Sequence, residues 1–115
     1  MTKEELREKL NALNPQSSVG DLQAYVSNMI QIRGFEDETL KDLMILLTEE
    51  IGELAKEVRK LSHLKTDVTN HSISDIEGEL ADIFIYLLSI CRNLNIDLFQ
   101  AFKNKEIRNS NRTWE

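Results

Sequence analysis

The sequence predicts an all-α fold, a bundle of four or five helices, from three observations. Apolar residues recur at intervals of three and four along most of the chain, which is the spacing of one helix face. No stretch alternates apolar and polar residues for long enough to make a strand. The 115 residues include one proline and four glycines, too few for a turn-rich all-β chain. A chain of this length forms one small core, so we expect residues 1–115 to be a single domain.

Two helices are expected in the first third of the chain. The first begins at a capping-box pattern of Thr2 and Glu5, continues through leucines at helical spacing, and stops before Pro15. The second covers Val19 to Arg33, and Gly34 fits as its C-terminal stop.

A long helix follows, roughly from Leu40 to Leu61, because leucines and a valine line one side of it. The polar residues 63–72 then predict a loop, in which His63 and His71 are surface residues. Neither histidine forms an E-x-x-H pair with the acids, which argues against a di-iron oxidase type of bundle.

Two more helices complete the prediction. One ends near Leu94 and is apolar nearly all round over residues 83–91, so we expect this stretch to be the most buried. Asp97 can cap a last helix that reaches Arg108 or beyond.

Charge and composition exclude several functions. The net charge of −6 argues against a nucleic acid polymer or an anionic membrane as a partner. The apolar run at 83–91 is too short to span a bilayer, and the N-terminal residues are too charged for a secretory signal. The single cysteine, Cys91, cannot form a disulfide framework and suggests a reducing compartment. We therefore expect a cytoplasmic protein.

Two acidic pairs lie at the edges of apolar helix faces. Glu50 and Glu53 belong to the long helix, and Glu79 and Asp82 to the later one. Residues three apart share a side of a helix, so each pair borders the side that faces the core. If those two faces pack together, four carboxylates converge.

Such a convergence is costly without a cation. Two like charges about 4 Å apart repel by roughly 4 kcal/mol at an effective dielectric constant of about 20. Either some of the acids take up protons or a cation binds between them. Ligands that are all oxygen favour Mg²⁺, with Mn²⁺ as a substitute, over zinc.

The same acids also fit an ordinary structural role. Most E-x-x-E pairs are solvated or pair with nearby cations, and Lys56, Arg59 and Lys60 are available here. Two glycines weigh against that interpretation, since Gly52 and Gly78 each cost about 1 kcal/mol within a helix relative to alanine. Close approach of a backbone or a ligand would explain why they are tolerated.

The acidic pattern, EEIGEL followed by ELAD, resembles the signature of the MazG-like nucleoside triphosphate pyrophosphohydrolases, part of the all-α NTP pyrophosphatase superfamily. That signature is E-E-x-x-E, a spacer, and E-x-x-D. The matching residues are Glu49, Glu50, Glu53, Glu79 and Asp82. The resemblance extends from about Asp21 to Trp114, and it implies a single MazG-like domain.

The resemblance implies an enzyme that cleaves a (deoxy)nucleoside triphosphate between its α- and β-phosphates, releasing a monophosphate and pyrophosphate. Removal of aberrant nucleotides is one such role. By position, Glu50, Glu53, Glu79 and Asp82 would bind Mg²⁺. Glu49 would bind metal or orient the attacking water, so Glu49, Glu50 and Glu53 are the catalytic candidates. Family members form dimers or tetramers, which implies a homodimer or homotetramer here.

The C-terminal residues Lys105, Asn109 and Arg112 are spaced four and three apart, so a continued helix puts them on one side. In an acidic chain this basic stripe is a candidate phosphate clamp, and the resemblance places phosphate-contacting residues at these three positions. The alternative is a basic helix end that complements the helix dipole.

Aromatic residues are candidates for binding the base. Many relatives have tryptophan where this chain has Phe35, which would either stack on the base or cap the core. Phe99, Phe102 and Trp114 are further candidates, for which core packing or a disordered chain end is the competing explanation.

Two other functions stay open. One is a non-catalytic helical oligomer that acts as a scaffold or a nucleotide-binding module. The other is a relative of phosphoribosyl-ATP pyrophosphatase, although the C-terminal residues fit that branch less well.

Overall fold

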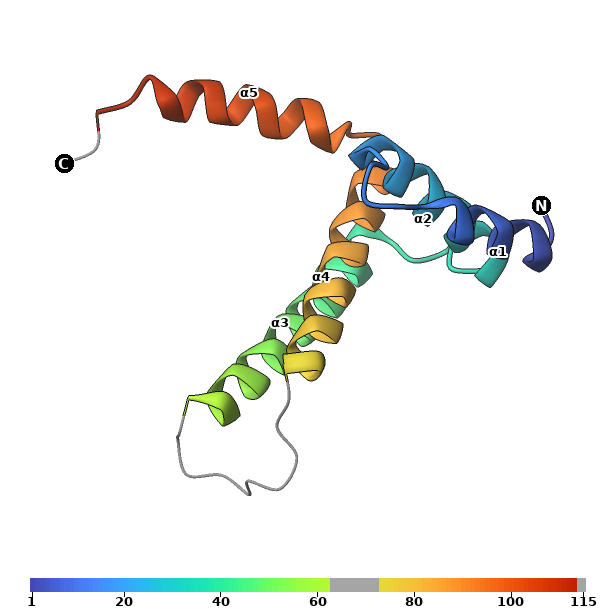
Figure 1. Ribbon diagram of the computed structural model, residues 1–115, viewed down its shortest axis with the longest axis horizontal. Coiled ribbons are helices and arrows are strands. Elements are labelled where there is room, and N and C mark those ends of the chain that lie inside the picture. Colours follow the sequence, from blue (N-terminus) through green and yellow to red (C-terminus); the bar gives the residue numbers. More distant parts are fainter. Residues whose placement is uncertain (63–72, 114–115) are drawn as a thin grey trace. The chain divides into compact units, whose positions relative to one another are not determined.

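The computed structural model describes residues 1–62 and 73–113, and all of its regular structure is helical (Figure 1). The helices are α1 (Lys3–Ala12), α2 (Val19–Arg33), α3 (Leu40–Leu61), α4 (Ile73–Leu94) and α5 (Leu98–Ser110). The described residues contain no strand, so the predicted all-α class is confirmed. The predicted loop with its two histidines, and Trp114, lie outside the described residues.

Local capping explains why α2 and α3 begin where the sequence predicted. The Asp21 amide donates to Ser18 Oγ at 3.0 Å, and the Ser18 amide donates to Asp21 Oδ2 at 2.9 Å. Thr39 and Asp42 form the same reciprocal pair before α3. Gly34 ends α2 in the left-handed conformation, with φ of 75°, which is the predicted glycine stop.

One compact unit comprises Met1–Asp37 and Cys91–Glu115. In it α1 packs on α2, and Leu6, Val26, Met29 and Ile30 are buried together with Cys91. Burial of these side chains supplies the main stabilisation of this unit.

The start of α5 is tied to α2 by one side chain of the same unit. Gln23 Nε2 donates to the Ile96 carbonyl at 2.8 Å, and the Leu98 amide donates to Gln23 Oε1 at 3.0 Å. Next to this junction, Arg92 Nε donates to Ser27 Oγ at 3.0 Å.

The other unit, Glu38–Ile90, is an antiparallel pair made of α3 and most of α4 (Figure 1). Leu43, Leu47 and Leu88 are buried in it. The prediction that residues 83–91 form the most buried stretch is only partly correct, because Phe84, Ile85 and Leu87 are exposed. The apolar surface of α4 is wider than this one hairpin can cover.

Candidate metal centre

The α3–α4 hairpin brings three acidic side chains together. One carboxylate oxygen from each of Glu50, Glu79 and Asp82 lies within 4.8 Å of the other two. Glu50 and Glu79 are half-buried, whereas Asp82 is exposed. α3 and α4 run antiparallel, and the side of α3 that carries Glu50 faces the side of α4 that carries Glu79 and Asp82.

We call Glu50, Glu79 and Asp82 the acidic cluster. The remaining acids of the signature lie around it. Glu53 is exposed and outside the cluster, yet its charge contributes to raising the pKa of Glu79. Glu49 is also exposed, and its charge acts on the neighbouring Tyr86. The structure therefore brings three of the four predicted metal ligands together and leaves Glu53 at the edge.

Glu79 has the most perturbed environment of the cluster. Hydrogen bonding with the Glu50 carboxyl, followed by burial, raises the pKa of Glu79 to about 7. Repulsion from the charges of Glu50, Asp82 and Glu53 adds to the same shift. The Glu79 carboxyl is therefore partly protonated near neutral pH.

One oxygen of this carboxyl has no hydrogen-bond partner. Glu79 Oε2 is buried and unpartnered among the described residues, and a buried polar atom of this kind normally has a partner. No cation of the described residues forms an ion pair with Glu50, Glu79 or Asp82; Lys60, further along α3, pairs with Glu57 at 3.3 Å. A cluster of carboxylate oxygens that includes an orphaned one fits a hard divalent cation.

Tyr86 is a neighbour of the cluster that the sequence analysis did not single out. It lies four residues after Asp82 and seven after Glu79, so all three share a face of α4. Burial, and then the charges of carboxylates beginning with Glu38 and Glu50, raises the pKa of Tyr86. The phenol therefore stays neutral and can donate a hydrogen bond beside the acids. Its helical spacing from the acids was the signal that could have found it.

The two helical glycines face open space. A Cβ atom built at Gly52 or at Gly78 would meet no atom of the described residues within 4 Å. Close approach of another part of this chain therefore does not explain them. The space beside them remains free for a ligand or a second chain.

The C-terminal candidates differ from the prediction in one respect. Lys105 and Asn109 lie on α5, but the helix ends at Ser110, so Arg112 lies beyond it. The expectation that a continued helix aligns all three residues is therefore wrong for Arg112. Its amide instead donates to the Asn109 carbonyl at 3.1 Å, in the turn that closes the helix.

The three aromatic candidates within the described residues are on the surface. Phe35 is 45 % exposed, so it does not cap the core of its unit. Phe99 and Phe102 are 53 % and 67 % exposed. The expectation of core packing is wrong for these two residues, because the side of α5 that carries them meets no neighbouring helix among the described residues.

The model of the MazG nucleotide pyrophosphohydrolase domain family matches residues 38–113, more than half of the chain. The chain belongs to this family. The predicted family is thus confirmed, and the match includes the acidic cluster and the C-terminal candidates. The search of curated proteins found no match.

MazG-family membership sets the general chemistry. The family acts on nucleotides and generally uses divalent metals, in agreement with the oxygen-rich donor set of the acidic cluster. None of the helices in the described residues is long and apolar enough to cross a membrane. Residues 1–37, which include α1, α2 and Phe35, precede the matched region.

Proposed function

We propose that this MazG-family chain is a Mg²⁺-dependent nucleoside triphosphate pyrophosphohydrolase. It cleaves (deoxy)nucleoside triphosphates between the α- and β-phosphates and releases a monophosphate and pyrophosphate, with removal of aberrant nucleotides as its role. The main support for the proposal is that Glu50, Glu79 and Asp82 lie close together and that Glu79 Oε2 has no hydrogen-bond partner among the described residues.

The acidic cluster would hold the ion, with Mn²⁺ as a substitute for Mg²⁺. Glu50, Glu79 and Asp82 would supply oxygen ligands, and Glu53, at the edge of the cluster, would be a fourth. When bound, such an ion would neutralise phosphate charge and lower the pKa of a water molecule. Glu49, one residue before Glu50 and exposed, orients that water or accepts its proton.

The substrate contacts come from residues outside the cluster. Lys105, Asn109 and Arg112 contact the phosphates, because cationic and amide donors suit phosphate oxygens. Phe35 stacks on the base, a role that its exposed ring supports.

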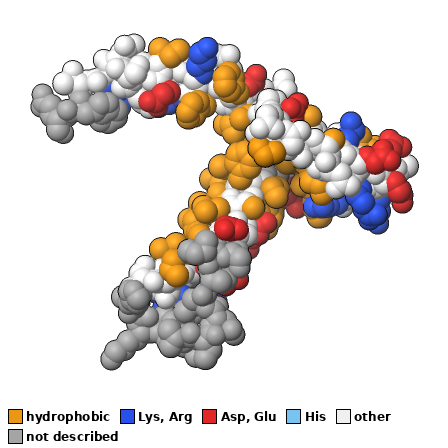
Figure 2. Space-filling model, viewed as in Figure 1, with side chains coloured by type: hydrophobic (Ala, Val, Ile, Leu, Met, Phe, Trp, Pro, Cys, Tyr) orange, Lys and Arg blue, Asp and Glu red, His pale blue; other side chains and the backbone are white. Residues whose placement is uncertain are grey.

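Self-association into a homodimer or homotetramer is part of the proposal. Figure 2 shows hydrophobic side chains gathered over the α3–α4 hairpin. The exposed large ones are Leu40, Met44, Ile45, Ile51, Val58, Leu61, Leu80, Phe84, Ile85 and Leu87. A concentration of apolar side chains on two adjacent helices is typical of an interaction surface, and a second copy would cover it with matching chemistry.

Pyrophosphate release from a panel of canonical and modified triphosphates, with and without Mg²⁺, tests the enzyme proposal. We expect release that requires the ion and is lost in Glu79→Gln. The matched control is Glu57→Gln, which removes an acid of α3 that pairs with Lys60 rather than with the cluster. Phosphoribosyl-ATP in the same panel tests the related pyrophosphatase activity.

The clamp and the assembly need separate measurements. Lys105→Ala and Arg112→Ala should lower kcat/KM while the helical content is unchanged. An unaltered kcat/KM in both variants would reject the phosphate clamp but would not affect the metal centre.

Light scattering measures the oligomeric state. An oligomer that binds no divalent ion and releases no pyrophosphate would favour the non-catalytic scaffold. The single domain over residues 1–115 and the cytoplasmic location stay predictions.

A further inference from the structure

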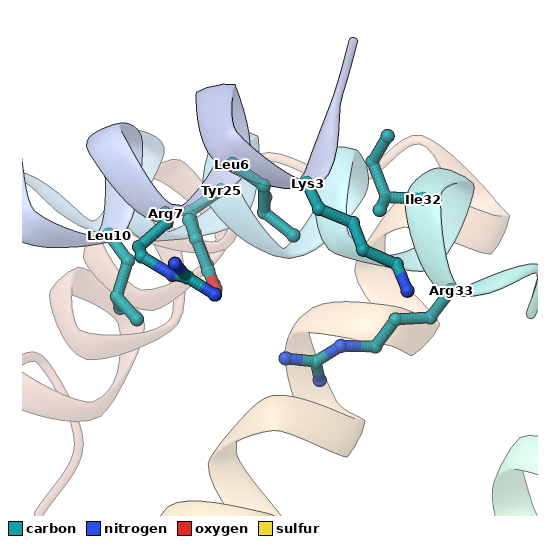
Figure 3. Close-up of a pocket in the computed structure, with 7 residues that line it drawn as sticks. All are labelled: Lys3, Leu6, Arg7, Leu10, Tyr25, Ile32 and Arg33. Atoms are coloured by element: carbon teal, nitrogen blue, oxygen red, sulfur yellow. The ribbon is translucent and has the colours of Figure 1, made fainter.

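A pocket of about 310 Å³ lies between α1 and α2, in the unit that contains both helices (Figure 3). Leu6 and Leu10 of α1 and Ile32 of α2 provide its apolar walls. The helices that form it precede the family-matched region, so the pocket belongs to a part of the chain to which the family match assigns nothing.

Two of the three cationic residues of α1 face this pocket because of their spacing. Lys3 and Arg7 are four residues apart, on the side of the helix that also carries Leu6 and Leu10. The acids of α1, Glu4, Glu5 and Glu8, fall on the remaining sides at about 100° per residue. The helix thus presents two positive charges and two leucines to the pocket, and its negative charges elsewhere.

The second helix adds a third cation and a hydroxyl group. Arg33, the last residue of α2, and Tyr25, two turns earlier, both line the pocket. Figure 3 shows the ends of the Lys3, Arg7 and Arg33 side chains on the same side of the two helices, with Tyr25 extending in the same direction. No acidic side chain is among the lining residues.

This arrangement favours the binding of an anion. Like charges four residues apart destabilise a helix by about 0.2–0.5 kcal/mol. Lys3 also occupies the first turn of α1, where the helix dipole disfavours a cation. Among the described residues no carboxylate forms an ion pair with Lys3, Arg7 or Arg33. The three side chains are exposed, and in a chain with a net charge of −6 they make this cavity a local site of positive charge that an anion would neutralise.

We propose that this pocket binds a small phosphorylated anion, of mononucleotide size or smaller. Two arginines present the planar donor sets that bind phosphate oxygens in pairs, and Lys3 adds a point charge. Three cations match a group with several negative charges better than a single carboxylate. The volume is at the lower end of the range for ligand pockets, and the leucine walls accept an apolar part of the ligand.

An NMR titration of the full chain in EDTA tests the proposal. EDTA removes divalent ions, so phosphate cannot bind through metal at the acidic cluster, and Arg7→Gln, which lies outside the proposed phosphate contacts at Lys105 and Arg112, separates this pocket from the proposed enzyme function. The probes are inorganic pyrophosphate and adenosine monophosphate, which separate an inorganic from an organic source of phosphate. Glutarate serves as a dicarboxylate control.

We expect saturable shifts of the α1 amides and of those at the end of α2 with at least one phosphate probe. Arg7→Gln should weaken binding about tenfold or more, since a charge-assisted contact is lost, whereas the exposed Lys41→Gln, in the other unit, should not. Lys3→Gln provides a second variant that keeps the buried Leu6 in place.

Three results would overturn the proposal. One is the absence of saturable shifts in α1 and α2 with both phosphate probes. Another is equal binding of glutarate, which would reject phosphate as the ligand group. The third is unchanged affinity in both Arg7→Gln and Lys3→Gln while circular dichroism shows native helical content.

Discussion

Binding of a divalent ion to the acidic cluster should release a proton, to an extent set by pH. The pKa of Glu79 is raised to about 7, mainly by hydrogen bonding with Glu50. A metal ligand must be deprotonated, so the ion displaces the proton that these two carboxyls share. Proton release therefore reports directly on whether the ion enters between α3 and α4.

The magnitude follows from the pKa. A carboxyl with a pKa of about 7 is protonated in about 90 % of molecules at pH 6, about 50 % at pH 7 and about 10 % at pH 8. Binding of one ion should therefore release about 0.9, 0.5 and 0.1 proton at these pH values. The same competition should make the apparent affinity about tenfold weaker at pH 6 than at pH 8.

Isothermal titration calorimetry with Mg²⁺ or Mn²⁺, in two buffers of different ionisation enthalpy at each pH, counts the released protons. Glu79→Gln keeps the shape of the side chain but cannot titrate, so its proton release should be lost along with much of its affinity. Glu57→Gln should behave as the unmodified chain does, because Glu57 pairs with Lys60.

Equal proton release at pH 6 and pH 8 would show that the ion does not displace the Glu79 proton. Unchanged proton release and affinity in Glu79→Gln would show the same. Either result would place the ion away from the Glu50–Glu79 pair.

Three further predictions concern stability. Gly52→Ala and Gly78→Ala should each stabilise the metal-free chain by about 0.5–1 kcal/mol in urea unfolding, because a methyl group there meets only open space; a loss of stability would mean that the space is occupied. Thr39→Ala should cost about 1 kcal/mol, since it removes the oxygen that accepts from the Asp42 amide, and an unchanged free energy of unfolding would disprove that role. Between pH 4.5 and about 7 the folded chain keeps a proton on Glu79 that the unfolded chain releases. Its contribution to stability is therefore lost as pH rises, and the Tm of the unmodified chain should fall relative to that of Glu79→Gln across this window; a constant difference would argue against the raised pKa.

The helix boundaries were the most predictable part of the fold, because they depend on neighbouring residues. Ser18 and Thr39 cap α2 and α3 through residues three positions away, and Gly34 ends α2 by its own backbone freedom. Both helices therefore begin and end at the residues that the sequence predicted. The end of α5 was less defined, and it lies two residues beyond Arg108.

Helical spacing predicted which face of each helix carries the acids of the site, but not which acids lie together. Spacing placed the acids on the inner edges of two helices. Which of them meet depends on how α3 and α4 pack, so Glu53 at the edge and Tyr86 beside the cluster came from the structure. Core packing was the explanation that competed with base binding for Phe99 and Phe102, yet burial depends on neighbouring elements, and both side chains are exposed.

Gln23 has a consequence for the order in which the chain acquires its structure. Its amide both donates to the Ile96 carbonyl, 73 residues later, and accepts from the Leu98 amide. Glutamate lacks the donor and lysine lacks the acceptor, so neither can replace it in full. During synthesis α2 leaves the ribosome long before its partner residues exist. The direction of the first turn of α5, the helix that carries Lys105 and Asn109, is therefore set by the side chain of Gln23. These hydrogen bonds can form only after residues 96 and 98 have been synthesised.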